Sequence, residues 1–276
     1  MKADLHMHTN ASDGRLSNKA VFERAKEKGL DVLAITDHDV CKKETVKENI
    51  ALGKTYGILY IPGIELSTLC KGKSVHVLGY FQGEGYAHKA MEDYYTMTRK
   101  GREKRAKTFI ENLKNHHDIV IDYKTLLDLS RGVIARPHIA RAIQLNYPQY
   151  SYSEIFEKFI GDHTVSYVPS TKLTLKEGLA FLKAHGALSV LAHPVLLKPR
   201  IHDEVLAHSF DGIEANYVQN DNSDTTFYKT YAKTHDLLIT AGSDYHGIEL
   251  DPSHGDIGDV TLSGPDLNWF LDALKS

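Results

Sequence analysis

The 276-residue sequence has few cysteines, no long apolar run and little net charge. Cys41 and Cys70 are its only cysteines and form no CxxC pair, so we expect a reducing, cytoplasmic compartment. No apolar run approaches the ~18 residues of a membrane span, and no basic segment followed by an apolar stretch opens the sequence. We therefore expect no membrane partner and no signal peptide. The formal net charge of −3 does not mark a nucleic-acid-binding protein.

The apolar pattern predicts an α/β fold. Apolar content of 42% and charged content of 25% are typical of a globular protein. Apolar runs at residues 31–36 and 187–192 predict strands buried on both faces, and amphipathic helical patterns alternate with such runs. This alternation predicts about seven strands in a parallel, nearly closed barrel that resembles a TIM barrel. The barrel would be formed by residues 1–97 and 168–276, with a helical insertion at 98–167.

Candidate metal ligands recur where the predicted strands end. His6 and His8 are two residues apart, so in a strand both rings face the same side. An isolated pair of this kind would more often be a surface feature, but others follow. They are Asp13 in the next turn, His38 after the second strand, Glu65 near the end of the third, His76 within the fourth, and His193, Asp244 and His246 after later strands. The carboxyl ends of parallel barrel strands are where active sites lie.

These nine side chains are too many for one ion. They suit two or three divalent ions that share Glu65 as a bridge. Imidazole and carboxylate ligands without thiolates are compatible with Mn, Fe or Zn and do not choose between them. Ions placed about 3.5–4 Å apart are typical of centres that hydrolyse phosphate esters.

Taken in order, the ligand motifs resemble those of a known superfamily. The motifs His6-x-His8, Thr36-Asp-His-Asp39, Gly63-Ile-Glu65, Val75-His-Val-Leu-Gly-Tyr80, Leu191-Ala-His-Pro194 and Gly242-Ser-Asp-Tyr-His246 resemble the successive motifs of the PHP (polymerase and histidinol phosphatase) superfamily. The insertion with Ala135-Arg-Pro-His138 is similar to the branch of small bacterial phosphoesterases. That branch includes nucleoside 3′,5′-bisphosphate phosphatases, AMP phosphatases and a 5′-to-3′ exoribonuclease.

The resemblance implies a distorted seven-stranded barrel and a trinuclear metal centre, with the insertion over the active site. It assigns His6, His8, Glu65 and Asp244 to one metal, Asp13, His38 and His246 to a second, and Glu65, His76 and His193 to a third. Many relatives have histidine where this chain has Asp13. A carboxylate makes that position harder and more anionic, which argues against a purely zinc site and admits Mn or Fe.

Candidate substrate contacts lie in the insertion and after a late strand. Arg136 and His138 flank Pro137 at the start of a predicted helix, where backbone N–H groups favour an anion. Arg136 could bind a phosphate through both arms of its guanidinium, although both side chains could instead cap the helix or face solvent. Asn216 is a further candidate for substrate binding. One of the two aspartates beside His38, Asp37 or Asp39, is expected to orient an imidazole, although either could be a turn residue.

We therefore expect a metal-dependent phosphoesterase. A hydroxide shared by the metals would attack phosphorus in line, with Asp13, His38 and His246 at the metals and Arg136 neutralising the developing charge. The expected substrates are nucleoside 3′,5′-bisphosphates or AMP, with short 5′-phosphorylated RNA as an extension, and no obligate protein partner is inferred. A histidinol-phosphate-type phosphatase, a metal-dependent amidohydrolase and a non-catalytic PHP module stay open as alternatives.

Overall fold

The computed structural model describes residues 1–130, 134–169, 171–248 and 253–275. The chain divides into two compact units. The larger unit comprises Met1–Glu92 and Lys172–Ser276, and the smaller comprises Asp93–Thr171. Each unit has a hydrophobic core of its own, and we describe each by itself.

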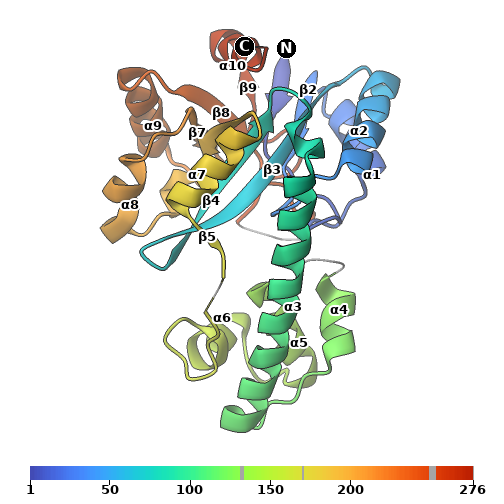
Figure 1. Ribbon diagram of the computed structural model, residues 1–276, viewed down its shortest axis with the longest axis vertical. Coiled ribbons are helices and arrows are strands. Elements are labelled where there is room, and N and C mark those ends of the chain that lie inside the picture. The colour runs from blue at the N-terminus through green and yellow to red at the C-terminus, as the bar shows by residue number, and fades with distance from the viewer. Residues whose placement is uncertain (131–133, 170, 249–252, 276) are drawn as a thin grey trace. The chain divides into compact units, whose positions relative to one another are not determined.

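The larger unit is built on one curved sheet that nearly closes into a barrel (Figure 1). Its strands are β1 (Lys2–Asp4), β2 (Val32–Ile35), β3 (Leu59–Cys70), β4 (Lys73–Phe81), β5 (Leu173–Thr174), β6 (Ala187–Leu191), β7 (Gly212–Tyr217), β8 (Leu238–Gly242) and β9 (Leu262–Ser263), in the order β8-β7-β6-β4-β3-β2-β1-β9, with β5 beside β3. The chain after β1 runs along the end of β8. Leu5 N donates to Ala241 O at 3.1 Å and His8 N to Tyr245 O at 2.9 Å, which joins the two sides of the sheet.

Two features of the sheet differ from the sequence prediction. Strand β4 is antiparallel to both β3 and β6, whereas the alternation pattern predicted parallel strands. The cause is the two-residue turn Lys71-Gly72, in which both residues have positive φ, 46° and 74°. Such a turn makes a tight hairpin, and a parallel connection would need a dozen or more residues. The structure also adds two-residue strands, β5 and β9, to the seven that were predicted.

Helices flank the strands of the larger unit. They are α1 (Asn18–Glu27), α2 (Lys43–Tyr56), α7 (Leu175–Ala184), α8 (Pro199–Leu206), α9 (Asn222–Thr234) and α10 (Gly264–Ala273), with 3-10 turns η1 (Glu84–Ala87) and η3 (Pro194–Leu196). Ser17 caps α1, because its side chain accepts a bond from Ala20 N at 3.4 Å. Helix α8 begins at Pro199, where proline's fixed φ favours a helix.

The smaller unit is helical, as its sequence predicted. It contains most of α3 (Lys89–His117), then α4 (Tyr123–Ser130), α5 (Arg136–Asn146), α6 (Tyr152–Ile155) and a π-helical turn η2 (Phe156–Ile160). Its core includes the fully buried Phe109, Leu113 and Leu126. A membrane-crossing helix would have to be longer or more apolar than any helix in the described ranges.

An ion pair ties α1 to the loop between β8 and β9. Arg24 donates to both carboxylate oxygens of Asp256, at 2.7 and 2.5 Å, and Lys28 Nζ lies 2.7 Å from Asp256 Oδ2. Burial works to raise the pKa of Asp256, but the bonds from Arg24 and Lys28 outweigh it and lower the pKa to about 2. The carboxylate therefore stabilises the fold above about pH 4, and this contribution is lost as the pH falls toward 2.

We expect Asp256→Asn to lower the free energy of unfolding by about 1–2 kcal/mol at pH 7, after allowance for solvent screening. The difference between the two proteins should shrink steadily between pH 5 and pH 3, because wild type loses the same contribution there. Urea unfolding at pH 7, 5, 4 and 3 measures it. A difference that stays constant over this range would show that the charge of Asp256 is not what stabilises the loop.

Candidate metal centre

The nine predicted ligands all lie in the larger unit and gather at one end of the sheet. Their ligand atoms form overlapping groups in which the atoms lie within 4.8 Å of one another: His6, His8, Glu65 and Asp244; His8, Asp13, His38 and His246; and His38, Glu65 and His76. His193 joins through Glu65, since its Nε2 lies 3.0 Å from Glu65 Oε1. A further histidine, His254, groups with Asp244 and His246.

Glu65 is the centre of this arrangement. Its Oε2 lies 3.3 Å from His6 Nε2, 3.1 Å from His8 Nε2 and 3.0 Å from His38 Nδ1. Its Oε1 lies 2.8 Å from His76 Nδ1 and 3.0 Å from His193 Nε2. One carboxylate thus faces five imidazoles, with its two oxygens directed at two different sets. This is the geometry expected of a bridging ligand.

The positions of Glu65 and His76 follow from the hairpin. Glu65 lies in the middle of β3 and not near its end, because β3 continues beyond the pairing with β2, which stops at Pro62. His76 is opposite Ser67 in the β3–β4 register. Because β4 is antiparallel, its early residues lie at the edge where the parallel strands end. His76 therefore reaches the same place as ligands that follow strands.

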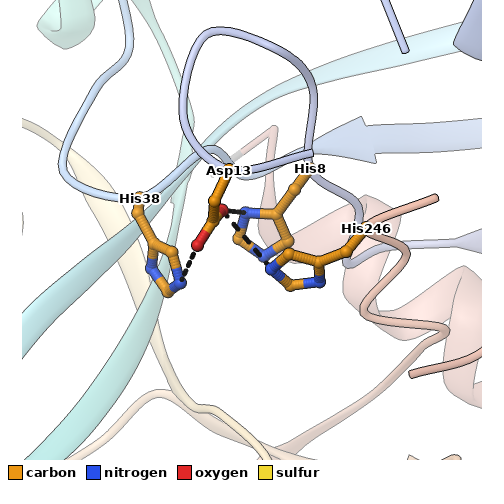
Figure 2. Close-up of side chains that lie close together, drawn as sticks. All are labelled: His8, Asp13, His38 and His246. Atoms are coloured by element: carbon orange, nitrogen blue, oxygen red, sulfur yellow. Dashed lines mark ion pairs between the residues drawn. The ribbon is translucent and has the colours of Figure 1, made fainter. Parts of the chain in front are cut away.

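Asp13 is the acidic member of the second group (Figure 2). Its Oδ1 lies 3.3 Å from His246 Nε2 and 3.6 Å from His8 Nδ1, and its Oδ2 lies 3.6 Å from His38 Nε2. The loop that carries Asp13 folds tightly against the strand end, and a side chain on Gly14 would come within 2.4 Å of His8 O. The Ser12-Asp13-Gly14 turn therefore directs the carboxylate back at the histidines, as the sequence predicted.

Asp37 holds this loop in place. Its Oδ1 accepts bonds from Thr9 N at 2.8 Å and Ser12 Oγ at 2.6 Å, and its Oδ2 from Thr9 Oγ1 at 2.7 Å. Asp39 accepts from Ser67 N at 2.7 Å and so ties the turn after β2 to β3. Asp37 thus takes the turn role that the sequence also allowed for it, and the expectation that one of the two aspartates orients an imidazole stays a prediction.

The carboxylate that orients a histidine is Glu214, which the sequence reading missed. It lies on β7 and is fully buried. Its Oε1 lies 3.0 Å from His6 Nδ1, and its Oε2 accepts from His193 N at 2.7 Å. A carboxylate on the outer nitrogen of a ligating histidine fixes the tautomer that leaves the inner nitrogen free for a metal. A glutamate inside an otherwise apolar strand is the signal that could have identified it.

Two more buried groups support Asp244. Asp4 Oδ2 accepts from Ser243 Oγ at 2.6 Å and from Gly258 N at 2.9 Å. Tyr217 OH donates to Asp244 Oδ2 at 3.0 Å. These bonds clamp the turn after β8, so that the other oxygen of Asp244 faces His6 and His8 at 3.2 and 3.1 Å.

Strained backbone occurs at ligand positions. His193 has φ 28° and Asp244 φ 52°, and Asp39 next to His38 has φ 57°. Positive φ is unfavourable for residues with a side chain and costs of order 1–3 kcal/mol at each position. Glu214 and the hydrogen bonds around Ser243 hold two of these residues in place, which is typical of sites where position matters more than local stability.

The charges of the cluster are strongly coupled. Burial works against charge on Glu65, but His38, His76 and His6 around it hold the pKa of its carboxyl well below the usual range. Burial also lowers the pKa of His38, to about 3, against the opposing pull of Glu65. At neutral pH Glu65 is therefore an ionised carboxylate and His38 a neutral imidazole, the forms in which these two side chains bind metals, whereas the bonds of His8 to Asp244 and Glu65 outweigh its burial and raise its pKa to about 10.

Buried polar atoms without hydrogen-bond partners indicate that the cluster is suited to hold metal ions. Five buried side-chain atoms at its centre make no hydrogen bond in the described structure: Asp13 Oδ1, His38 Nδ1, Glu65 Oε2, His76 Nδ1 and Asp244 Oδ1. Buried polar atoms are rarely left without a partner in native proteins. All five belong to the overlapping ligand groups described above, and divalent cations held by those groups would satisfy them.

The predicted substrate-binding residues are placed less clearly. In the smaller unit, Arg136 is the first residue of α5, and its Nη1 lies 2.5 Å from Asp162 Oδ1. His138 is buried, and its Nδ1 accepts from Ala135 N at 3.0 Å, so it caps the helix. Asn216 is half-buried on β7 beside a break in the strand register. Their roles in substrate binding stay predictions.

Comparison with known proteins establishes the family. The PHP domain model matches residues 4–238. The chain belongs to the PHP family. It is 29% identical over 256 residues to the 5′-3′ exoribonuclease Rnm of Salmonella typhimurium, with 88% of this chain and 84% of the relative covered. It is 26% identical over 250 residues to the 3′,5′-nucleoside bisphosphate phosphatase of Chromobacterium violaceum, with 88% and 86% covered.

A solved PHP-like structure confirms the predicted TIM-like α/β fold. The structure, described as a metal-dependent phosphoesterase from Bifidobacterium adolescentis, superposes with a TM-score of 0.80 at 27% identity and covers 98% of this chain and 96% of its own. Family and relatives together make this PHP protein a metal-dependent phosphoric ester hydrolase.

Proposed function

We propose that this PHP protein removes phosphate from small nucleotides, foremost nucleoside 3′,5′-bisphosphates and AMP, and that it also acts on short 5′-phosphorylated RNA. The observation that supports this most is the buried carboxylate of Glu65, which faces five imidazoles at the centre of the nine ligand-type side chains. The relatives named as an exoribonuclease and a bisphosphate phosphatase support a nucleotide substrate. The thiols of Cys41 and Cys70 are both free, and we keep a cytoplasmic location as part of the proposal.

The residues fall into three metal positions. His6, His8, Glu65 and Asp244 would hold one ion, Asp13, His38 and His246 a second, and Glu65, His76 and His193 a third. When bound, the ions would polarise the phosphoryl group and lower the pKa of water, so that hydroxide forms at neutral pH. The carboxylate at Asp13 favours Mn or Fe over a purely zinc centre.

The chain's own residues position these groups. Glu214 orients His6, Asp37 holds the loop of Asp13, and Asp4 and Tyr217 support Asp244. Such buried partners fix ligands within the narrow range that catalysis needs. Arg136 and His138 are proposed to bind the phosphate of the substrate, and Asn216 to contact the substrate. Asp162 would have to share or release Arg136 when substrate binds.

The test combines metal analysis with a panel of phosphate esters. The purified protein is reconstituted with Mn, Fe or Zn and assayed for phosphate release from AMP, a nucleoside 3′,5′-bisphosphate, histidinol phosphate and a short 5′-phosphorylated RNA. We expect two or three ions per chain and the highest rates with the nucleotides. Preference for histidinol phosphate would contradict the proposed substrate class.

Asp244→Ala is the matching site variant. Its Oδ1 faces His6 and His8, and loss of this carboxylate should empty the first metal position. We expect phosphate release to fall at least about 100-fold, since a single lost group that stabilises the transition state costs about 3–4 kcal/mol. Wild-type turnover in this variant would show that the proposed site is wrong.

A further inference from the structure

A lysine outside the nine ligands reaches the edge of the metal cluster. Lys172 Nζ donates to Ser74 Oγ at 2.9 Å, and the same oxygen lies 3.3 Å from His76 Nε2. His76 Nδ1, on the other side of the ring, faces Glu65 at 2.8 Å. The ammonium therefore lies one side chain further out than the ligand atoms.

The two-residue strand β5 determines where Lys172 lies. Leu173 pairs with Thr68 of β3, which puts Lys172 level with Ser67. In the β3–β4 hairpin Ser67 is opposite His76, and Leu69 is opposite Ser74. Residues Glu65, Ser67, His76 and Ser74 thus share one face of the hairpin, and Lys172 reaches across that face. The sequence reading identified neither β5 nor this lysine.

We propose that Lys172 binds a second phosphate of the substrate and sets a preference for nucleotides that carry two phosphates. This inference rests on the proposed function. A nucleoside 3′,5′-bisphosphate has two anionic groups separated by a ribose. When one is held at the metal ligands, the other lies beyond them. An ammonium on the far side of His76 from Glu65 is placed for the outer group.

The chemistry of lysine suits this role. Its ammonium is a compact charge with three donors, and Ser74 accepts a hydrogen bond from it. Lys172 is half-buried, so a phosphate that reaches it is partly shielded from solvent. A hydrogen bond between charged partners in such a place contributes roughly a 10- to 100-fold effect on binding.

Lys172→Met tests the proposal with adenosine 3′,5′-bisphosphate and AMP as substrates of the metal-loaded enzyme. We expect the ratio of kcat/KM for the bisphosphate to that for AMP to fall about 10-fold or more, mainly through a higher KM for the bisphosphate. Lys172→Arg should restore at least part of the ratio because it keeps the charge. Lys71→Met, in the β3–β4 turn where Lys71 pairs with Glu204, is the matched control and should keep the wild-type ratio.

Ser74→Ala separates substrate binding from support of His76. It removes the oxygen between Lys172 and His76 but keeps the ammonium, so the preference for the bisphosphate should persist. If Ser74→Ala and Lys172→Met both lower kcat/KM equally for the two substrates and also reduce the amount of bound metal, Lys172 acts through His76 and the proposal is wrong. An unchanged ratio in Lys172→Met with an active wild type would also overturn it. A wild-type enzyme inactive on both nucleotides would instead overturn the proposed function.

Discussion

Replacing Glu65 by glutamine is expected to abolish tight metal binding at two positions and to lower phosphate release at least about 1000-fold, equivalent to about 4 kcal/mol. The variant keeps the size of the side chain but removes the charge that faces five imidazoles. Its amide nitrogen would direct its two N–H groups at two of those rings, whose nitrogen atoms must offer lone pairs to a cation. No other described carboxylate meets so many of the predicted ligands.

Two measurements check this result independently. Metal content after reconstitution should fall by at least one ion per chain. Thermal unfolding should also respond less to added metal, since ligand binding stabilises the native state by about 2.7 kcal/mol at 100 times Kd and the variant loses that linkage. A Glu65→Gln protein with wild-type metal content and activity would show that the cluster is not the catalytic centre.

Replacing Glu214 by glutamine is expected to weaken metal binding about 10- to 100-fold while leaving activity largely recoverable in excess metal. Glu214 accepts two N–H groups, one from His6 Nδ1 and one from His193 N. Glutamine has one acceptor oxygen and one donor nitrogen, so it can satisfy only one of them. Either His193 loses the bond that holds its strained backbone, or His6 shifts its proton to the metal-facing nitrogen. Loss of such a partner typically costs 10- to 100-fold in metal affinity.

Asp211→Asn is the matched control for this variant. Asp211 Oδ2 also accepts two bonds in the same pair of strands, from Ser189 N and Ser189 Oγ, both at 2.8 Å, but at the opposite end from the ligands. It should change stability and leave metal affinity unchanged. Titration with Mn²⁺ distinguishes the two variants. Equal loss of metal affinity in both would mean that Glu214 acts only through the stability of the sheet.

The sequence predicted that the nine ligand-type side chains gather at one place because their signal is local. His6 and His8 are spaced for one strand face, and His38, His193 and Asp244 each follow an apolar run. Each of these patterns can be recognised within ten residues, and the barrel brings strand ends together whatever the details of the packing. The α/β barrel and the helical character of the insertion could be predicted for the same reason.

The supporting residues could not be predicted because their partners are distant in sequence. Glu214 lies 208 residues from His6. A buried glutamate in a strand gives no sign of which histidine it meets. The same holds for Lys172, whose partner Ser74 is 98 residues away, and for Arg136, whose contact with Asp162 depends on how the helices of the smaller unit pack. The antiparallel direction of β4 could have been predicted, because the Lys71-Gly72 turn is short enough to require a hairpin.

The contacts between the chain around β1 and the end of β8 determine when the metal centre can be completed during protein synthesis. Asp4 and Ser243 are hydrogen-bonded although 239 positions separate them, and a side chain on Gly242 would collide with His6 Cβ at 2.2 Å. At 5–20 residues per second, a ribosome needs roughly 10–50 s to make the intervening chain. The smaller unit, which comes in the middle and has its own core, can fold during that interval. The metal positions that include Asp244 or His246 can therefore be completed only after nearly the whole barrel has been translated, and until then His6 and His8, which follow the first strand, have no carboxylate from the turn after β8 to share a cation with.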